Sequence, residues 1–193
     1  MVNLWGIVTL GLAASAAASP AAFNAVVGQS DPGRPGKGNN SPDCGKYNFV
    51  FTGLPWNHPG VAASGFTSQQ AEAGLRSDMA AIAQAGYNIK AILTGPEDDL
   101  SFISKELKGV SWTGVGVGFG VRGNPSPLIT RRLMDILQLY RDEASCARIL
   151  FNYSPTTSLW AIQQYFPLQT NCTDSPGKSL GIAIRCKACN PPV

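Results

Sequence analysis

The chain contains few charged residues. Only 14% of its 193 residues are Asp, Glu, Lys or Arg, the formal net charge is +3, and one histidine is present. A dense cluster of lysine and arginine is missing, which argues against the basic surface typical of nucleic-acid binding. The adjacent pair Arg131 and Arg132 is interpreted as the solvent-facing side of a helix. We therefore expect no nucleic-acid partner.

Several short motifs with known chemistry are also missing. The sequence has no Walker A phosphate loop and no G-x-S-x-G nucleophile elbow. Gly116 and Gly118 have the spacing of the first two glycines of a dinucleotide fingerprint, but Val121 takes the third place. A zinc ribbon needs two C-x-x-C pairs, and only Cys186 and Cys189 have this spacing. We therefore expect neither a cofactor nor a metal.

The N-terminal segment carries the signs of export. Residues 4–12 are apolar, which is too short for a membrane span of ~20 residues, and the small residues at 13–19 suit cleavage. Residues 1–18 are therefore predicted to be a signal peptide, with an uncleaved anchor or a plain tail as alternatives. Residues 19–43, rich in Gly, Pro, Asn and Ser, are predicted to be a flexible linker. The expected product is secreted and extracellular, with no membrane attachment after cleavage.

Four of the five cysteines lie at the edges of the predicted domain: Cys44, Cys172, Cys186 and Cys189. In a secreted chain they indicate two disulfides, with three pairings open, which would tie the tail at 167–193 to the start of the domain. Zinc ligation by the C-x-x-C pair is the alternative. The fifth, Cys146, is expected to be a buried free thiol.

Three glycosylation sequons occur. Asn171-Cys172-Thr173 predicts a glycan on Asn171. The sequons at Asn39 and Asn152 are each followed by proline, which disfavours their use, and Asn152 is expected to lie inside the fold.

Strand-like and helix-like segments alternate four times between Tyr47 and Phe166. Strands are expected at 47–52, 88–94, 112–121 and 148–153, each followed by a helix. This alternation predicts βαβ units, hence an α/β domain over 44–166 with a three-layer, doubly wound, four-stranded parallel sheet of order 2-1-3-4. Residues 180–184 are a candidate for an extra edge strand.

Glycine alternates with apolar residues from Gly114 to Val121. In a strand, this pattern leaves one face almost without side chains, which is costly and calls for a reason. Either a helix packs very close, which we favour, or a ligand approaches the backbone. Arg122 follows on the bare face and would suit an anion.

Ligands of open α/β sheets bind beyond the carboxyl ends of the strands at the topological switch point, here between the first and third strands. The leading hypothesis is therefore a small anionic ligand, such as a nucleotide or sugar phosphate, held by Arg122 and strand-end amides and covered by Trp56. The candidate ligand-binding residues are Gly53, Trp56, Gly120, Arg122, Asn152 and Thr156.

Two other functions stay open. His58 with Glu97 or Ser154 would be the catalytic set of a hydrolase. Two of the candidate residues also have a structural interpretation. His58 could brace its loop, and Arg122 could pair with Glu97 or Asp98 to lock two loops together. The third hypothesis is an extracellular interaction or effector protein without catalysis. The oligomeric state is left open.

The segments at 51–59, 118–122 and 151–156 resemble those of a family of small, uncharacterised α/β proteins from bacteria and filamentous fungi. The resemblance covers Tyr47 to Phe166 and implies a compact Rossmann-like or flavodoxin-like domain, but no activity. The N-terminal signal and the cysteine-bearing tail are additions to that pattern, which implies a secreted, glycosylated fungal version.

Overall fold

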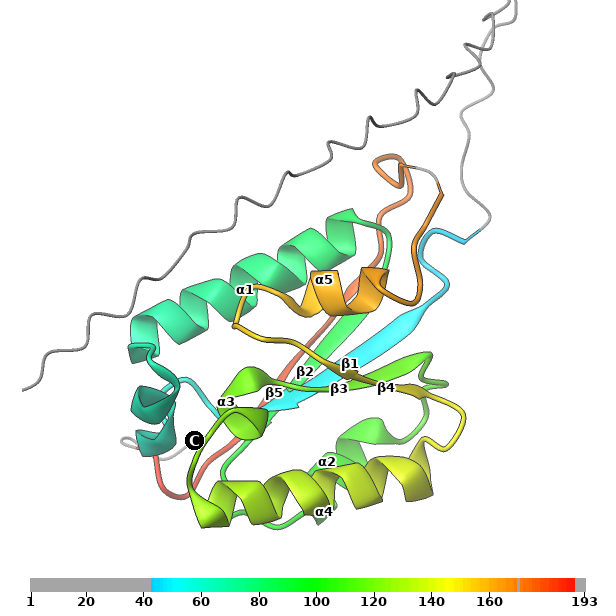
Figure 1. Ribbon diagram of the computed structural model, residues 1–193. Coiled ribbons are helices and arrows are strands. Elements are labelled where there is room, and N and C mark those ends of the chain that lie inside the picture. The colour runs from blue at the N-terminus through cyan, green and yellow to red at the C-terminus, as the bar shows by residue number, and fades with distance from the viewer. Residues whose placement is uncertain (1–42, 170, 190–193) are drawn as a thin grey trace, which may run out of the picture. The chain divides into compact units, whose positions relative to one another are not determined.

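The computed structural model describes residues 43–169 and 171–189, so the predicted signal peptide and nearly all of the linker lie outside the described residues. A parallel sheet forms the centre of the domain (Figure 1). Its strands are β1 (Asn48–Gly53), β2 (Asn88–Thr94), β3 (Gly114–Val117), β4 (Arg148–Phe151) and β5 (Ser179–Arg185), in the order β4-β3-β1-β2-β5.

Helices cover both faces of the sheet, which confirms a three-layer α/β fold (Figure 1). On one face lie α1 (Ser68–Gln84) and α5 (Ser158–Gln163), and on the other lie α2 (Ser101–Leu107) and α4 (Pro127–Glu143). Two short elements, η1 (Pro59–Ser64) and α3 (Phe119–Arg122), follow the carboxyl ends of β1 and β3. The loops after these strands are thus where an open sheet of this type accepts a ligand.

The sheet has five strands rather than four. The predicted order 2-1-3-4 is extended because the tail adds β5 in parallel beside β2. Two hydrogen bonds fix the start of β5, from Lys178 N to Asn88 Oδ1 (2.8 Å) and from Ile89 N to Lys178 O (2.9 Å). Just before them, a Cβ on Gly177 would lie 2.1 Å from Tyr87 O, so only glycine lets the chain pass there.

The expectation of one strand over 112–121 is wrong. Strand β3 ends at Val117, because Val121 N and Arg122 N both donate to Gly118 O (3.0 Å each) and turn the chain into α3. Arg122 therefore does not continue a glycine face of the strand.

The bare face of β3 is covered by aromatic rings of the neighbouring strand, where we had expected a closely packed helix. A Cβ on Gly116 would lie 2.3 Å from the Phe51 ring, and one on Gly114 would lie 2.8 Å from the Phe49 ring. Both rings belong to β1, which pairs with β3 in parallel, and both are buried in the core on the α1–α5 face. The glycines thus give these two rings the space to lie across β3.

The two disulfides join Cys44 to Cys172 and Cys186 to Cys189. The first fulfils the expected tie between the start of the domain and the tail, whereas the second closes a turn directly after β5. Cys146, expected to be buried, is an exposed thiol, because the turn before β4 leaves it on the surface.

We predict that Gly116→Ala lowers the free energy of unfolding by about 1–3 kcal/mol, since the new methyl group overpacks against the buried Phe51 ring. Gly118→Ala is the matched control, because its Cβ would make an ordinary 3.6 Å contact with Thr52 O and its φ is −68°. Chemical denaturation measures both. Equal stability of the two variants would contradict the proposed packing.

We also predict that the two disulfides contribute very unequally to the free energy of unfolding. Removing Cys44–Cys172, whose cysteines lie 128 residues apart, should cost about 5 kcal/mol, and removing Cys186–Cys189, 3 apart, about 2 kcal/mol. The longer closed loop restricts the unfolded chain more. Paired Cys→Ser variants compared by urea denaturation test this, and a larger loss from the tail pair would refute it.

Candidate functional site

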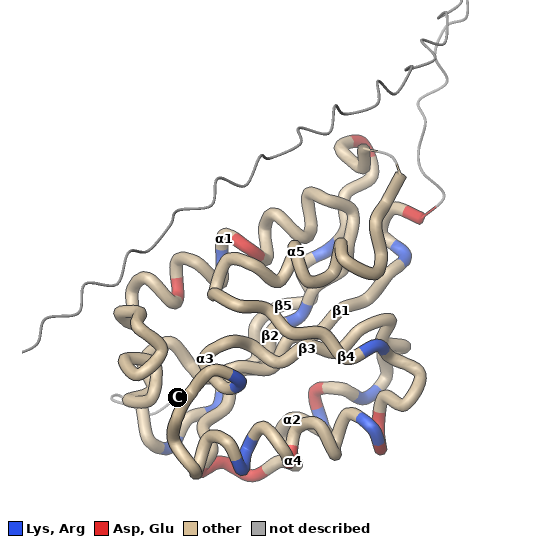
Figure 2. Tube along the Cα trace, in the orientation of Figure 1, with Lys and Arg blue, Asp and Glu red and all other residues tan. Residues whose placement is uncertain are grey.

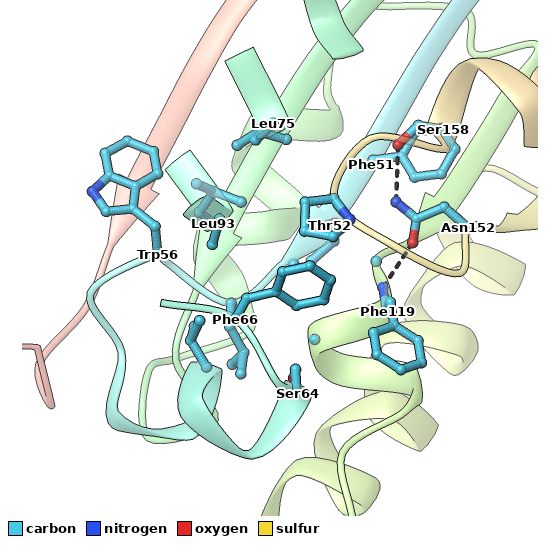
Figure 3. A pocket seen from close by; sticks show the side chains of 17 residues that line it. Phe51, Thr52, Trp56, Ser64, Phe66, Leu75, Leu93, Phe119, Asn152 and Ser158 are labelled. Atoms are coloured by element: carbon cyan, nitrogen blue, oxygen red, sulfur yellow. Dashed lines mark hydrogen bonds between the residues drawn. The ribbon is translucent and has the colours of Figure 1, made fainter. Parts of the chain in front are cut away.

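A pocket opens at the carboxyl ends of β1 and β3, the neighbouring strands at which the sheet order reverses (Figure 3). Residues of η1, α1 and the start of α5 complete its walls. The space open to the centres of water-sized molecules is ≈ 80 Å³, several times the ~10–15 Å³ that one water needs. The lining residues are Phe51, Thr52, Gly53, Leu54, Trp56, Val61, Ser64, Phe66, Ala71, Leu75, Leu93, Gly118, Phe119, Gly120, Asn152, Pro155 and Ser158.

Asn152, directly after β4, holds one side of the pocket together. Its Oδ1 accepts a hydrogen bond from Phe119 N (2.7 Å), and its Nδ2 donates to Ser158 Oγ (2.9 Å) (Figure 3). One buried amide thereby connects the ends of β3 and β4 to the start of α5. Its burial agrees with the expectation that this sequon lies inside the fold.

Tyr140 of α4 supports the pocket from the opposite face of the sheet. Its hydroxyl lies 2.6 Å from Thr52 Oγ1 and 3.0 Å from Gly116 O. Complete burial raises the pKa of this phenol. The hydroxyl therefore stays neutral and joins β1 to β3 at the point where the pocket begins.

The pocket is mainly apolar, and one of its polar side chains is left without a partner. Thr52, Asn152 and Ser158 are all hydrogen-bonded within the protein. By contrast, the Ser64 hydroxyl at the end of η1 is buried and has no hydrogen-bond partner among the described residues. Leaving such a group unpaired costs about 1–3 kcal/mol, so its position in the wall of the pocket calls for an explanation.

Four of the six expected ligand-binding residues line this pocket: Gly53, Trp56, Gly120 and Asn152. Arg122 and Thr156 do not. Arg122 is exposed, donates from Nη2 to Asn152 O (3.3 Å) and lies over the Phe119 ring at 5.4 Å. Arg122 therefore lies outside the pocket, and its guanidinium contacts two residues of the pocket wall, Asn152 and Phe119.

His58 and Glu97 are brought together, with 3.2 Å between His58 Nε2 and Glu97 Oε2. His58 Nδ1 accepts from Gly60 N (2.9 Å), so in the neutral ring the proton lies on Nε2 and points at Glu97. The imidazole is 6% exposed and caps η1, and neither residue lines the pocket. This is the bracing arrangement that the sequence left open for His58.

Ser154 is engaged in a separate turn after β4. Its hydroxyl lies 3.1 Å from Thr156 Oγ1, and Thr157 Oγ1 accepts from the Ser154 backbone N (3.0 Å). Within 43–169 and 171–189, no hydrogen bond joins Ser154 to His58 or Glu97. Of the three residues proposed for a hydrolase, His58 and Glu97 thus form a pair to which Ser154 is not hydrogen-bonded.

The arginine that fixes the loop after β2 is Arg132, which sequence reasoning had placed in solvent. It is 4% exposed and donates from Nη2 to Gly95 O (2.6 Å) and to Asp98 O. Burial lowers the pKa of its guanidinium. The helical phase of α4 was the available signal, because Arg132 falls on the same side as the buried Ile129 and Ile136.

A second missed residue is Asp78 of α1, which caps α5 from another part of the chain. Its carboxylate accepts from Ser158 N (2.7 Å) and Leu159 N (3.4 Å), whereas Thr157, at the N-cap position, gives no side-chain cap. Burial raises the pKa of Asp78, and hydrogen bonds from Ser158 and Leu159 oppose the rise. Its i,i+4 spacing to the buried Ile82 was the only sequence signal.

The remaining predictions concern the surface. Asn171 is exposed, and its Oδ1 accepts from Thr173 N (3.0 Å). Acidic and basic residues are mixed along α1 and α4 (Figure 2). Among the described residues, no group of three His, Cys, Asp or Glu side chains is arranged to hold a metal ion. None of the described helices is both long and apolar enough to cross a bilayer.

The chain matches no protein-family model, and neither a curated protein sequence nor a solved structure is detectably similar to it. The resemblance to the uncharacterised bacterial and fungal family therefore stays a prediction. Functional inference rests on the geometry of the pocket.

Asp78 gives the domain a defined pH dependence. Because its folded-state pKa lies above 3.8, its contribution to stability is fully present below the unfolded pKa and is lost as pH rises through the folded pKa. We predict that this fall is absent in Asp78→Asn, whose amide oxygen still accepts from Ser158 N. Unfolding free energies measured from pH 3 upward test this. A wild-type advantage over the variant that grows with pH would contradict it.

Proposed function

We propose that the domain binds a small molecule with an apolar, ring-sized body in the switch-point pocket, where the ligand forms one hydrogen bond with Ser64. The unpaired, buried Ser64 hydroxyl within apolar walls is the observation that carries this proposal. Ligand sites in proteins typically combine such walls with a few polar groups that fix orientation.

The hypothesis of a small anionic ligand held by Arg122 and strand-end amides finds less support, because Arg122 does not line the pocket. Neither a lysine nor an arginine is among the described residues that line it, and a phosphate would lose its hydration there without a matching charge. The anionic part of a ligand would have to lie at the rim. The fit is better for a neutral apolar body, with Phe66 and Phe119 beside it (Figure 3).

A hydrolase based on His58 is not our leading proposal, because both imidazole nitrogens are engaged and the ring lies outside the pocket lining. Secretion and an extracellular role stay proposals that the two disulfides support, since such bonds persist in oxidising compartments.

The test compares toluene with phenol, by calorimetry and thermal unfolding of the full-length oxidised chain. Both should bind and stabilise the fold, by about 2.7 kcal/mol at 100 times the dissociation constant. Ser64→Ala should weaken phenol about fivefold, for one lost hydrogen bond, and leave toluene unchanged.

A second pair of variants tests the location. A Cβ on Gly120 would have its nearest neighbours at 3.8 Å and 4.0 Å, so Gly120→Ala should retain binding. Gly120→Leu should fill the pocket and abolish binding of both compounds. If neither compound binds to the wild-type chain, or if Gly120→Leu binds them unchanged, the proposed function is wrong.

A further inference from the structure

A second hollow lies beside the pocket, on the other side of Trp56. It is a groove between α1 and β5, with ≈ 510 Å³ open to the centres of water-sized molecules. This volume falls within the ~300–1,000 Å³ typical of small-molecule sites. Trp56 lines both the pocket and the groove, so the two spaces are neighbours across one side chain.

The groove has a cation at the end that adjoins the pocket. The Arg76 guanidinium lies over the Trp56 ring, 5.2 Å from its centroid, and also lines the groove. Its Nε and Nη2 both lie 2.9 Å from Glu72 Oε1 on the same helix. Nη1 has no hydrogen bond within the described part of the chain, which leaves donors for a second, singly charged partner.

The other walls of the groove are small and aliphatic. They include Ala80 on α1 and Ile182 and Ile184 on β5. Gly181, with φ +95°, has nothing within 4 Å of the place where a Cβ would lie, so the groove is open there. No carboxylate side chain lines the groove among the described residues. The Nη1 donors that Glu72 leaves unused therefore suit an anionic acceptor, and the aliphatic walls suit a hydrocarbon chain.

We infer that the protein takes an elongated monocarboxylate, whose apolar body occupies the pocket and whose chain passes Trp56 to place the carboxylate at Arg76. This inference rests on the proposed function, because the body binds in the same pocket. A doubly charged phosphate would be opposed by the adjacent Glu72, whereas a carboxylate shares the guanidinium with it.

The experiment compares 5-phenylpentanoate with the neutral 5-phenylpentan-1-ol, by calorimetry on the full-length oxidised chain at low salt. The acid should bind about fivefold more tightly than the alcohol, as expected for an exposed charge pair. Arg76→Gln should remove this preference and leave the affinity for the alcohol unchanged. Arg131→Gln is the matched control, since Arg131 has the same i,i+4 pairing with an acid on an exposed helix face.

A groove-filling pair of variants separates the chain from the charge. Ala80→Phe should weaken both phenylpentyl compounds and leave toluene unchanged, whereas Ser77→Phe, exposed on α1 and outside the groove lining, should change neither. If toluene binds but the acid has no advantage over the alcohol, or keeps it in Arg76→Gln, the inference is overturned while the pocket stands. If none of the compounds binds, the proposed function fails with it.

Discussion

The packing of Phe49 and Phe51 across β3 is the constraint on which the rest of the domain depends. Both rings lie where β3 has no side chains, and a methyl group at Gly116 would already collide with one of them. Because Phe51 also lines the pocket, the core and the candidate site share a wall. Gly114 and Gly116 lower the stability of β3 as a strand, but they make room for the two rings and thus set the position of the pocket at the carboxyl end of β3.

Buried polar side chains then fix the loops around that pocket. Asp78 satisfies backbone N–H groups of α5, Asn152 satisfies one of α3, and Arg132 satisfies carbonyls of the loop after β2. Neither α3 nor α5 has a side-chain hydrogen bond from its own N-cap residue. The short elements near the site are therefore held by long-range bonds, because an isolated helix of this length is unstable in water.

The alternation of strands and helices could be predicted from the sequence, because hydrophobic periodicity and caps are local signals. Two such signals flank α1: the capping box of Thr67 and Gln70 at its start, and Gly86, with φ +97°, just after its end. The end of β3 could not be predicted, since a turn at Gly118 and a continuing strand give the same glycine alternation. The position of β5 beside β2 could not be predicted either, because it depends on the close passage of Gly177 over the Tyr87 backbone in the folded chain.

The pocket lies at the strand ends where the sequence predicted a site, but several of the candidate side chains point elsewhere. The switch-point rule pointed to the segments that follow the strands, and four residues of those segments line the pocket: Gly53, Trp56, Gly120 and Asn152. It could not give the direction of side chains, so Arg122 was assigned to the pocket and Arg132 to solvent, whereas the first lies outside the lining and the second is buried. Ser64 carries no sequence signal at all, since a serine at the end of a short 3₁₀ helix is ordinary.

The polarity of the proposed ligand follows from the polar groups that the pocket and the groove offer. A charged group buried beside Phe51 and Leu54 would lose its hydration without a matching charge among the described lining residues, whereas an apolar body there would have little hydration to lose. At the groove the balance reverses, because the Arg76 guanidinium is half in water and an anion keeps much of its hydration. A ligand that matches both spaces is therefore apolar at the end that enters first and charged at the end that stays outside, and Trp56 lies between the two.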